Sequence, residues 1–182
     1  MKLKRTFYTR PDVVQIAKDL IGKELHAIGA YGHRAGIIVE TEAYSHREKA
    51  CHAYLKRNTN RTRTMFMKGG TAYIYLCYGI HHLFNIVTNE ESTPEAILVR
   101  ALQPLEESAE RRVTSGPGKL TKYLGIDKRL DATDLTGDVL WLEDAGHQYE
   151  LEASERIGID YAEEDKHLPW RFTAKGNVWV SK

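Results

Sequence analysis

The sequence predicts a single mixed domain of the α/β (α+β) class that spans residues 1–182. Apolar residues recur at helical spacing near the N-terminus and between residues 105 and 124, whereas β-branched and aromatic residues dominate the runs between residues 24 and 101. No repeat, low-complexity segment or linker divides the chain. A chain of 182 residues can bury a substantial core, and 42% hydrophobic with 28% charged residues is ordinary for a soluble globular protein.

The first expected element is a helix over Pro11–Ile21, whose apolar side chains form one stripe. Proline suits the first turn of a helix, and Gly22 follows as the stop. The elements expected next are a strand over residues 24–28, a turn over 29–32, a strand running into Tyr44, a loop or short helix over 45–52 and a loop over 53–68.

Two β-rich runs, Thr71–Tyr78 and His81–Thr88, meet at Tyr78-Gly79 and predict a β-hairpin. The remaining elements expected are a strand over residues 95–101 ended by Pro104, helices over 105–113 and 119–124, and short strands over 139–143 and 178–180.

The run Val39–Tyr44 is unusual because it places two carboxylates inside a β-prone segment. In a strand, Glu40, Glu42 and Tyr44 share one face, and the alternate residues take the other. An acid beside an aromatic suits a pocket that holds and attacks a flat substrate. A plainer alternative is an edge strand whose carboxylates are solvated.

Charge is distributed unevenly although the net charge is only +1. The segment 56–68 carries five cations and no acid, whereas the segment 131–165 carries twelve acids and a single cation, Arg156. Cations spaced by Asn and Thr suit a phosphate backbone, although a solvated loop that aids solubility is an alternative. We expect the acidic segment to face away from a polyanion.

The hairpin combines an apolar and an aromatic face. Tyr73, Tyr75 and Cys77 point one way, and the alternate residues, which end at Tyr78, point the other. A tyrosine ladder is also a common packing device. At the expected tip, however, Tyr78 has little core to enter. Its position beside the basic loop (residues 53–68) suggests a wedge between stacked bases.

The number of cysteines and the hydropathy pattern limit the cellular location that we expect. Two cysteines, Cys51 and Cys77, are too few for a disulfide framework, so we expect a reducing, cytoplasmic location, associated with the nucleoid if the source is bacterial. No run approaches membrane-spanning length, and the N-terminus lacks the apolar core of a signal peptide. The pairs Cys51-His52 and His81-His82 lack further ligands at zinc spacing. We therefore expect no metal, cofactor or membrane contact, and a monomer.

Short motifs follow one another in a specific order along nearly the whole chain. They are Val39–Tyr44, Ala50–His52, Met65–Lys68, Gly70–Tyr75, Tyr78-Gly79, Asn85-Ile86, Leu98–Ala101, Ser115–Pro117, Trp170–Phe172 and Trp179–Ser181. The ordered set resembles the alkyladenine (3-methyladenine) DNA glycosylases. The resemblance implies one DNA glycosylase domain with a curved, mostly antiparallel sheet, surrounding helices and a protruding β-hairpin.

The resemblance also implies base-excision repair on double-stranded DNA. Such enzymes flip a damaged purine out of the duplex and hydrolyse its N-glycosidic bond. Glu42 matches the carboxylate that activates the attacking water, and Arg100 matches a basic residue beside it that holds the carboxylate ionised. No lysine occupies the attacking position, which predicts a monofunctional enzyme without lyase activity.

The remaining matched residues are expected to handle the base and the duplex. Tyr44, His52 and Tyr75 match the pocket that sandwiches the flipped base; a satisfied core histidine is the alternative for His52. Asn85 matches the residue that crowds the amino group of guanine, and Tyr78 matches the side chain that enters the minor groove. The expected contacts to the DNA backbone are Arg57, Arg61, Arg63 and Lys68.

Several positions depart from the vertebrate form of the pattern. Gly69 stands in place of a proline, the segment from Tyr44 to His52 is one residue shorter, and His81-His82 replaces aromatic and apolar residues. These changes touch the pocket rim, so the range of substrates (3-methyladenine, 7-methylguanine, hypoxanthine, ethenoadenine) is less constrained than the reaction. The chain starts without a long N-terminal extension, as expected of a compact bacterial form.

Two other classes of function stay open from sequence. A non-catalytic binder of damaged DNA or other nucleic acid would keep the basic loop and Tyr78 but would need no carboxylate at position 42. A binding module related to the sugar-nucleotide or formyl-transfer folds would need neither a flipped base nor a wedge.

Overall fold

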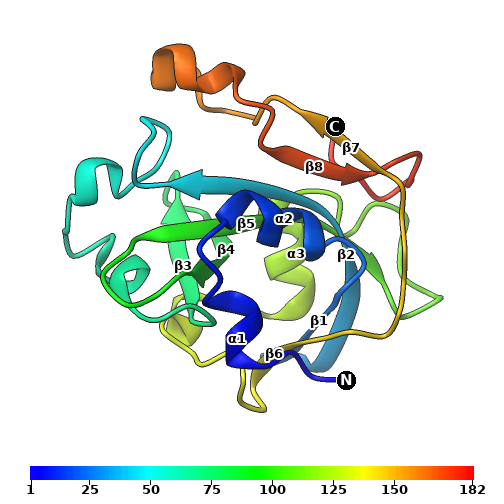
Figure 1. Ribbon diagram of the computed structural model, residues 1–182. Helices are drawn as coiled ribbons and strands as arrows, with labels where there is room; N and C mark the ends of the chain where they lie inside the picture. Colours follow the sequence, from blue (N-terminus) through cyan, green and yellow to red (C-terminus); the bar gives the residue numbers. More distant parts are fainter.

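A curved antiparallel sheet organises the chain in the computed structural model, which describes residues 1–182 (Figure 1). Its strands run in the order β3-β4-β5-β2-β1-β6, and β8 pairs with both β2 and β7. The strands are β1 (Glu24–Gly29), β2 (Gly32–Ser45), β3 (Ala72–Cys77), β4 (His81–Thr88), β5 (Glu95–Pro104), β6 (Leu140–Glu143), β7 (Leu151–Ser154) and β8 (Arg171–Ala174). Every paired strand is antiparallel, which confirms the predicted mixed α+β class.

Short helices surround this sheet. They are α1 (Arg5–Tyr8), α2 (Val13–Asp19) and α3 (Pro117–Leu124), with 3-10 turns η1 (Tyr54–Lys56), η2 (Arg63–Phe66), η3 (Lys128–Leu130) and η4 (Asp160–His167). The predicted first helix is found but is shorter, because the Asp12 carboxylate begins it at Val13 by accepting the Gln15 N–H at 2.9 Å, and Pro11 precedes the helix instead of lying in its first turn. None of the helices combines the length and the apolar character needed to cross a lipid bilayer.

The strand β2 lies in the interior of the sheet and pairs with β1, β5 and β8. The alternative of a solvated edge strand is therefore wrong: Glu40 and Glu42 are both fully buried. The predicted split between faces is confirmed, because Val39 and Ala43 enter the main core and the Thr41 hydroxyl donates to the Ala17 carbonyl at 2.9 Å.

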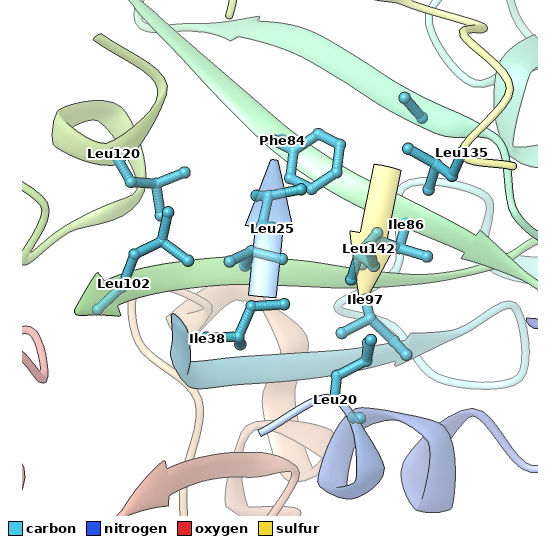
Figure 2. Close-up of a cluster of buried hydrophobic side chains, with 14 of the residues drawn as sticks. Leu20, Leu25, Ile38, Phe84, Ile86, Ile97, Leu102, Leu120, Leu135 and Leu142 are labelled. Atoms are coloured by element: carbon cyan, nitrogen blue, oxygen red, sulfur yellow. The ribbon is translucent and has the colours of Figure 1, made fainter. Parts of the chain in front are cut away.

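The main core fills the concave side of the sheet, between the strands and the helices α2 and α3 (Figure 2). Figure 2 shows Phe84 and Ile97 from the sheet in the same cluster as Leu120 of α3 and Leu20. Along β4 and β5, the core residues alternate with residues of the opposite face. Asn85 of β4 and Arg100 of β5 are polar residues on that opposite face. The alternation therefore gives the sheet an apolar face and a second, chemically mixed face.

The predicted hairpin is confirmed, with β3 paired to β4 from Ala72 opposite Ile86 to Cys77 opposite His81. Its tip is formed by Tyr78 at φ 50° and Gly79 at φ 72°, values that glycine adopts easily and tyrosine seldom does. Two of the three strands predicted after residue 94 are also found, the first extending to Pro104 and the second over Leu140–Glu143.

Two predicted elements are wrong. Residues 105–113 form turns instead of a helix, since Leu105 stays 42% exposed and Arg112 adopts φ 65°, so no apolar face is available to hold a helix to the core. Residues 178–180 form a turn instead of a strand. The Asn177 side chain and carbonyl accept the N–H groups of Trp179 and Val180, which removes them from any ladder.

Candidate active site

A cavity of about 590 Å³ opens on the side of the sheet opposite the main core. Its walls come from β3, from the adjoining faces of β2, β4 and β5, and from residues 157–161, and several of its lining residues are aromatic. Tyr44, His52, Tyr75, Tyr78, Asn85 and Arg100, all predicted as site residues, line this cavity. The fold thus brings together residues from six separate motifs.

The aromatic wall is built around His52 and Tyr75, whose rings meet edge-to-face with centroids 4.7 Å apart. The Nδ1 atom of His52 lies 3.2 Å from the Tyr73 hydroxyl, so the ring is fixed by one hydrogen bond and by edge-to-face contacts with both tyrosines. Burial, together with the charge of Arg61, lowers the pKa of His52 to about 4. The His52 ring in this wall is therefore uncharged near neutral pH. The cavity that the wall lines has room for a flat ring.

The Glu42 carboxylate is held by three donors. The Tyr44 hydroxyl donates to Oε2 at 2.8 Å and an Arg100 Nη1 donates to it at 3.3 Å, while the Ile157 N–H donates to Oε1 at 2.7 Å. Glu42 itself is fully buried and lies directly behind these three lining residues. Burial and the negative charge of Glu42 raise the pKa of Tyr44 well above its usual range, so Tyr44 stays a donor.

An irregularity in the ladder between β2 and β5 gives Arg100 its position. Ile38 pairs with Leu102, Glu40 with Ala101 and Thr41 with Val99, so that Arg100 has no direct partner on β2. Bulges of this kind re-aim a side chain and are common beside active sites. Here the guanidinium reaches two carboxylates, donating to Glu40 through Nε at 3.0 Å and to Glu42 through Nη1.

Glu40, for which the sequence offered no role, is the centre of a buried polar network. Its Oε1 accepts from Arg100, from Arg171 Nε at 2.8 Å and from the Ser181 hydroxyl at 2.8 Å, while Oε2 accepts the Ser181 N–H at 2.7 Å. Burial alone would raise the pKa of Glu40, but these hydrogen bonds and the two guanidinium charges hold it below its usual range. The network ties β8 and the last residues of the chain to the floor of the site.

Asn85 and Tyr78 mark the inner and outer ends of the cavity. Asn85 is buried, and its side-chain amide donates to the Tyr73 carbonyl at 3.1 Å, which fixes its orientation on the wall. Tyr78 is 92% exposed at the hairpin tip, and Ile80 beside it is 72% exposed. An exposed apolar tip at a cavity mouth requires a partner or a functional reason.

The cations of the basic loop are not equivalent. Arg57 and Arg63 are exposed, whereas the Lys68 Nζ lies 3.6 Å from a Glu90 carboxylate oxygen. Arg61 lines the cavity, with its guanidinium carbon 5.0 Å from the centroid of the Tyr75 ring. The predicted backbone contacts of all four side chains stay predictions.

Sequence reasoning missed the buried ion pair between Glu48 and Arg156. Two parallel hydrogen bonds of 2.9 and 3.0 Å join them, and the guanidinium also donates to the Ala43 carbonyl and lies 4.8 Å from the Tyr44 ring centroid. Arg156 is the only cation in the acidic segment, and this isolated position was the one sequence signal for the contact. The pair fixes the next residue, Ile157, beside Glu42.

Part of the acidic segment lies at the site, through uncharged residues; that its carboxylates face away from a polyanion stays a prediction. Ile157, Gly158, Ile159 and Tyr161 line the cavity, and the Tyr161 hydroxyl donates to the Ala50 carbonyl at 2.9 Å. Charge counts could not reveal this arrangement because the residues of the segment that line the cavity are uncharged, and the buried Arg156 fixes Ile157 beside Glu42.

Comparison with known proteins shows the family of the chain. The family model described as methylpurine-DNA glycosylase (MPG) matches residues 6–178. A protein of Clostridium novyi named "Putative 3-methyladenine DNA glycosylase" is 38% identical, with 100% of this chain and 98% of the relative covered. Proteins of the same name from Bacillus cereus and Alkaliphilus oremlandii are 40% and 39% identical, with both chains fully covered. The chain therefore belongs to the methylpurine-DNA glycosylase family.

Proposed function

We propose that this protein excises 3-methyladenine from double-stranded DNA by hydrolysis of the N-glycosidic bond, with Glu42 as the residue that activates water. The observation that carries the proposal is the Glu42 carboxylate, fixed by three donors behind the wall of an aromatic cavity. The names of the relatives support the substrate. The proposal also includes 7-methylguanine, hypoxanthine and ethenoadenine as further substrates.

Extrusion of the base is the first step. A base inside the stack cannot be attacked at its sugar carbon, and unstacking costs a few kcal/mol. Tyr78, exposed at the hairpin tip, enters the vacated space and offsets this cost, since base stacking on an aromatic ring contributes roughly 1–3 kcal/mol. The nearby cavity mouth then receives the flipped base.

The cavity favours a cationic purine. The base stacks between Tyr44 and the wall formed by His52 and Tyr75, and electron-rich faces attract an N-alkylated, positively charged ring more than a neutral one. His52 is uncharged near neutral pH, so it does not repel such a base. Asn85, fixed on the Tyr73 carbonyl, crowds the position that the amino group of guanine would take.

Cleavage needs one carboxylate because a cationic purine is a good leaving group. Water binds at Oε2 of Glu42, beside Tyr44 and Arg100, and gives its proton to the carboxylate as it attacks the sugar carbon. The negative charge of Glu42 also stabilises the oxocarbenium-like sugar. No covalent intermediate on the protein forms, so the enzyme is monofunctional and leaves the strand intact.

The test combines a Glu42→Gln variant with a panel of lesion-bearing duplexes, in which base release and strand cleavage are scored separately. We expect the variant to lose release of 3-methyladenine while it keeps its affinity for the damaged duplex, which also distinguishes an enzyme from a non-catalytic binder. Release at a rate comparable to the parent would exclude Glu42 as the activating residue. Strand cleavage by the parent without added base would exclude the monofunctional assignment.

A further inference from the structure

A second hollow, of about 490 Å³, lies beside α3 and is lined by five cations. We call it the basic hollow, and its cations are Arg34, Arg111, Arg112, Lys119 and Lys122. The helix α3 packs on the face of β4 that carries Phe84, whereas the neighbouring Asn85 faces the cavity. The helix α3, with the basic hollow beside it, and the active-site cavity therefore lie on opposite faces of β4.

The cations of the basic hollow have no acidic partners. No carboxylate oxygen lies within 4.0 Å of the charged nitrogens of any of the five, although Glu110 is among the lining residues. The nearby Glu106 carboxylate instead accepts the Tyr123 hydroxyl at 3.3 Å. Like charges that converge without counter-charges repel one another, which favours binding of an anion with several charges.

One of the cations is already held in place. The Arg34 guanidinium lies between two rings, 5.1 Å from the Tyr31 centroid and 5.0 Å from that of Tyr123, and it donates to the Tyr123 carbonyl at 2.8 Å. Its other N–H groups have no protein acceptor. A planar donor fixed in this way can bind a phosphate without ordering a free side chain first.

The helix α3, which supplies Lys119 and Lys122 to the basic hollow, contacts the start of β4, directly beside the hairpin tip that carries Tyr78. The Thr121 hydroxyl of α3 donates to the His82 carbonyl at 2.7 Å, and a Cβ at Gly118 would lie only 3.0 Å from the His81 ring. The hairpin tip thus projects between the cavity on one side and the basic hollow on the other.

We propose that the basic hollow binds backbone phosphates of the DNA arm on the side of Tyr78 opposite the cavity. The proposal rests on the proposed function, because it takes Tyr78 to enter the duplex. A side chain inserted between base steps bends the duplex by about 20–90°, so that each arm can contact a different face of the protein. Arg61 of the basic loop lines the cavity and can contact the arm on that side, and the basic hollow supplies the matching charge for the other arm.

The test variant replaces Arg111, Arg112, Lys119 and Lys122 by Gln and leaves the structural Arg34 intact. A matched control variant replaces four cations outside the hollow and the cavity by Gln, so that the net charge falls equally; these are Lys2, Lys4, Lys23 and Lys175. The dissociation constant of a duplex with an abasic site is measured by fluorescence anisotropy over a series of salt concentrations.

We expect the salt slope of log K to fall by roughly 2 to 4 in the test variant relative to the control variant, since each lost phosphate contact removes about 0.9. Single-turnover base release at saturating enzyme should stay unchanged, because the hollow does not line the cavity. Equal salt slopes in the two variants would overturn the proposal. Loss of polyglutamate binding in the test variant alone, with an unchanged salt slope for DNA binding, would also overturn it. Failure of the parent to bind the duplex at all would instead refute the proposed function.

Discussion

The buried ion pair between Glu48 and Arg156 connects the stability of the fold to the geometry of the active site. Arg156 donates to Glu48 and to the Ala43 and Asp165 carbonyls, and its guanidinium lies near the Tyr44 and Trp170 rings. The next residue donates its N–H to Glu42. We predict that Arg156→Met, which keeps the bulk and removes the charge, destabilises the protein and slows base release together.

The magnitude follows from what the substitution leaves behind. Glu48 is only 3% exposed and would keep the Ser45 and Ala50 N–H groups but no counter-charge. Breaking a buried pair by removal of one partner costs about 3–5 kcal/mol of unfolding free energy. The exposed pair Lys175–Glu150, with side chains 49% and 72% accessible, should contribute less than about 1 kcal/mol. Displacement of the Ile157 N–H should lower kcat by roughly 10- to 100-fold.

Urea unfolding of Arg156→Met, of Glu48→Gln and of the double variant measures the coupling between the two residues, with Lys175→Met as the control for an exposed pair. We expect the double variant to be less destabilised than the sum of the single variants, because both charges are removed together. Single-turnover base release is measured on the same proteins below their unfolding transition. A loss below 1 kcal/mol in Arg156→Met, equal to the loss in the control, would refute the reasoning.

Three further perturbations test other parts of the structure. Gly69→Pro should lower the unfolding free energy by about 3 kcal/mol, because the Gly69 N–H donates to the Asn89 carbonyl at 2.9 Å; an unchanged thermal midpoint would contradict this. Glu40→Gln should cost about 3–5 kcal/mol by leaving Arg100 and a second guanidinium undercompensated, and a denaturation curve that overlays the parent's would exclude that role. The pKa of His52 falls from its ordinary 6.5 to about 4 on folding, so the unfolded chain binds the proton first and stability is lost as pH falls from 6.5 towards 4. The loss is at most roughly 3 kcal/mol, and a His52→Gln variant with the same pH dependence of stability as the parent would show that His52 is not its source.

Local patterns predicted the elements whose geometry is determined by neighbouring residues. Alternation along β2 placed Glu40 and Glu42 on one face and Thr41 on the other, since the period of a strand is two whatever surrounds it. The paired β-rich runs around Gly79 predicted the hairpin for the same reason. The site residues came from motif resemblance, and six of them line one cavity.

The sequence could not predict elements whose formation depends on distant partners. Residues 105–113 have helix-forming composition, but no surface is available to bury one face of the helix, so they form turns. The burial of β2 likewise depends on β5 and β8, which lie far along the chain. A carboxylate on an edge strand and one at the floor of a site have the same local sequence.

By itself, the sequence therefore determined the mixed fold, the hairpin with Tyr78 at its tip and the shared face of the two carboxylates. Tertiary structure alone decided that both carboxylates are buried, that the irregular pairing at Arg100 brings its guanidinium to them, and that Arg156 brings the Ile157 N–H to Glu42. The physical reason is that strand period and turn chemistry act between neighbours in sequence, whereas burial, ion pairing and buried hydrogen bonds depend on residues far apart in the chain, such as Glu40 and Ser181, which are 141 positions apart.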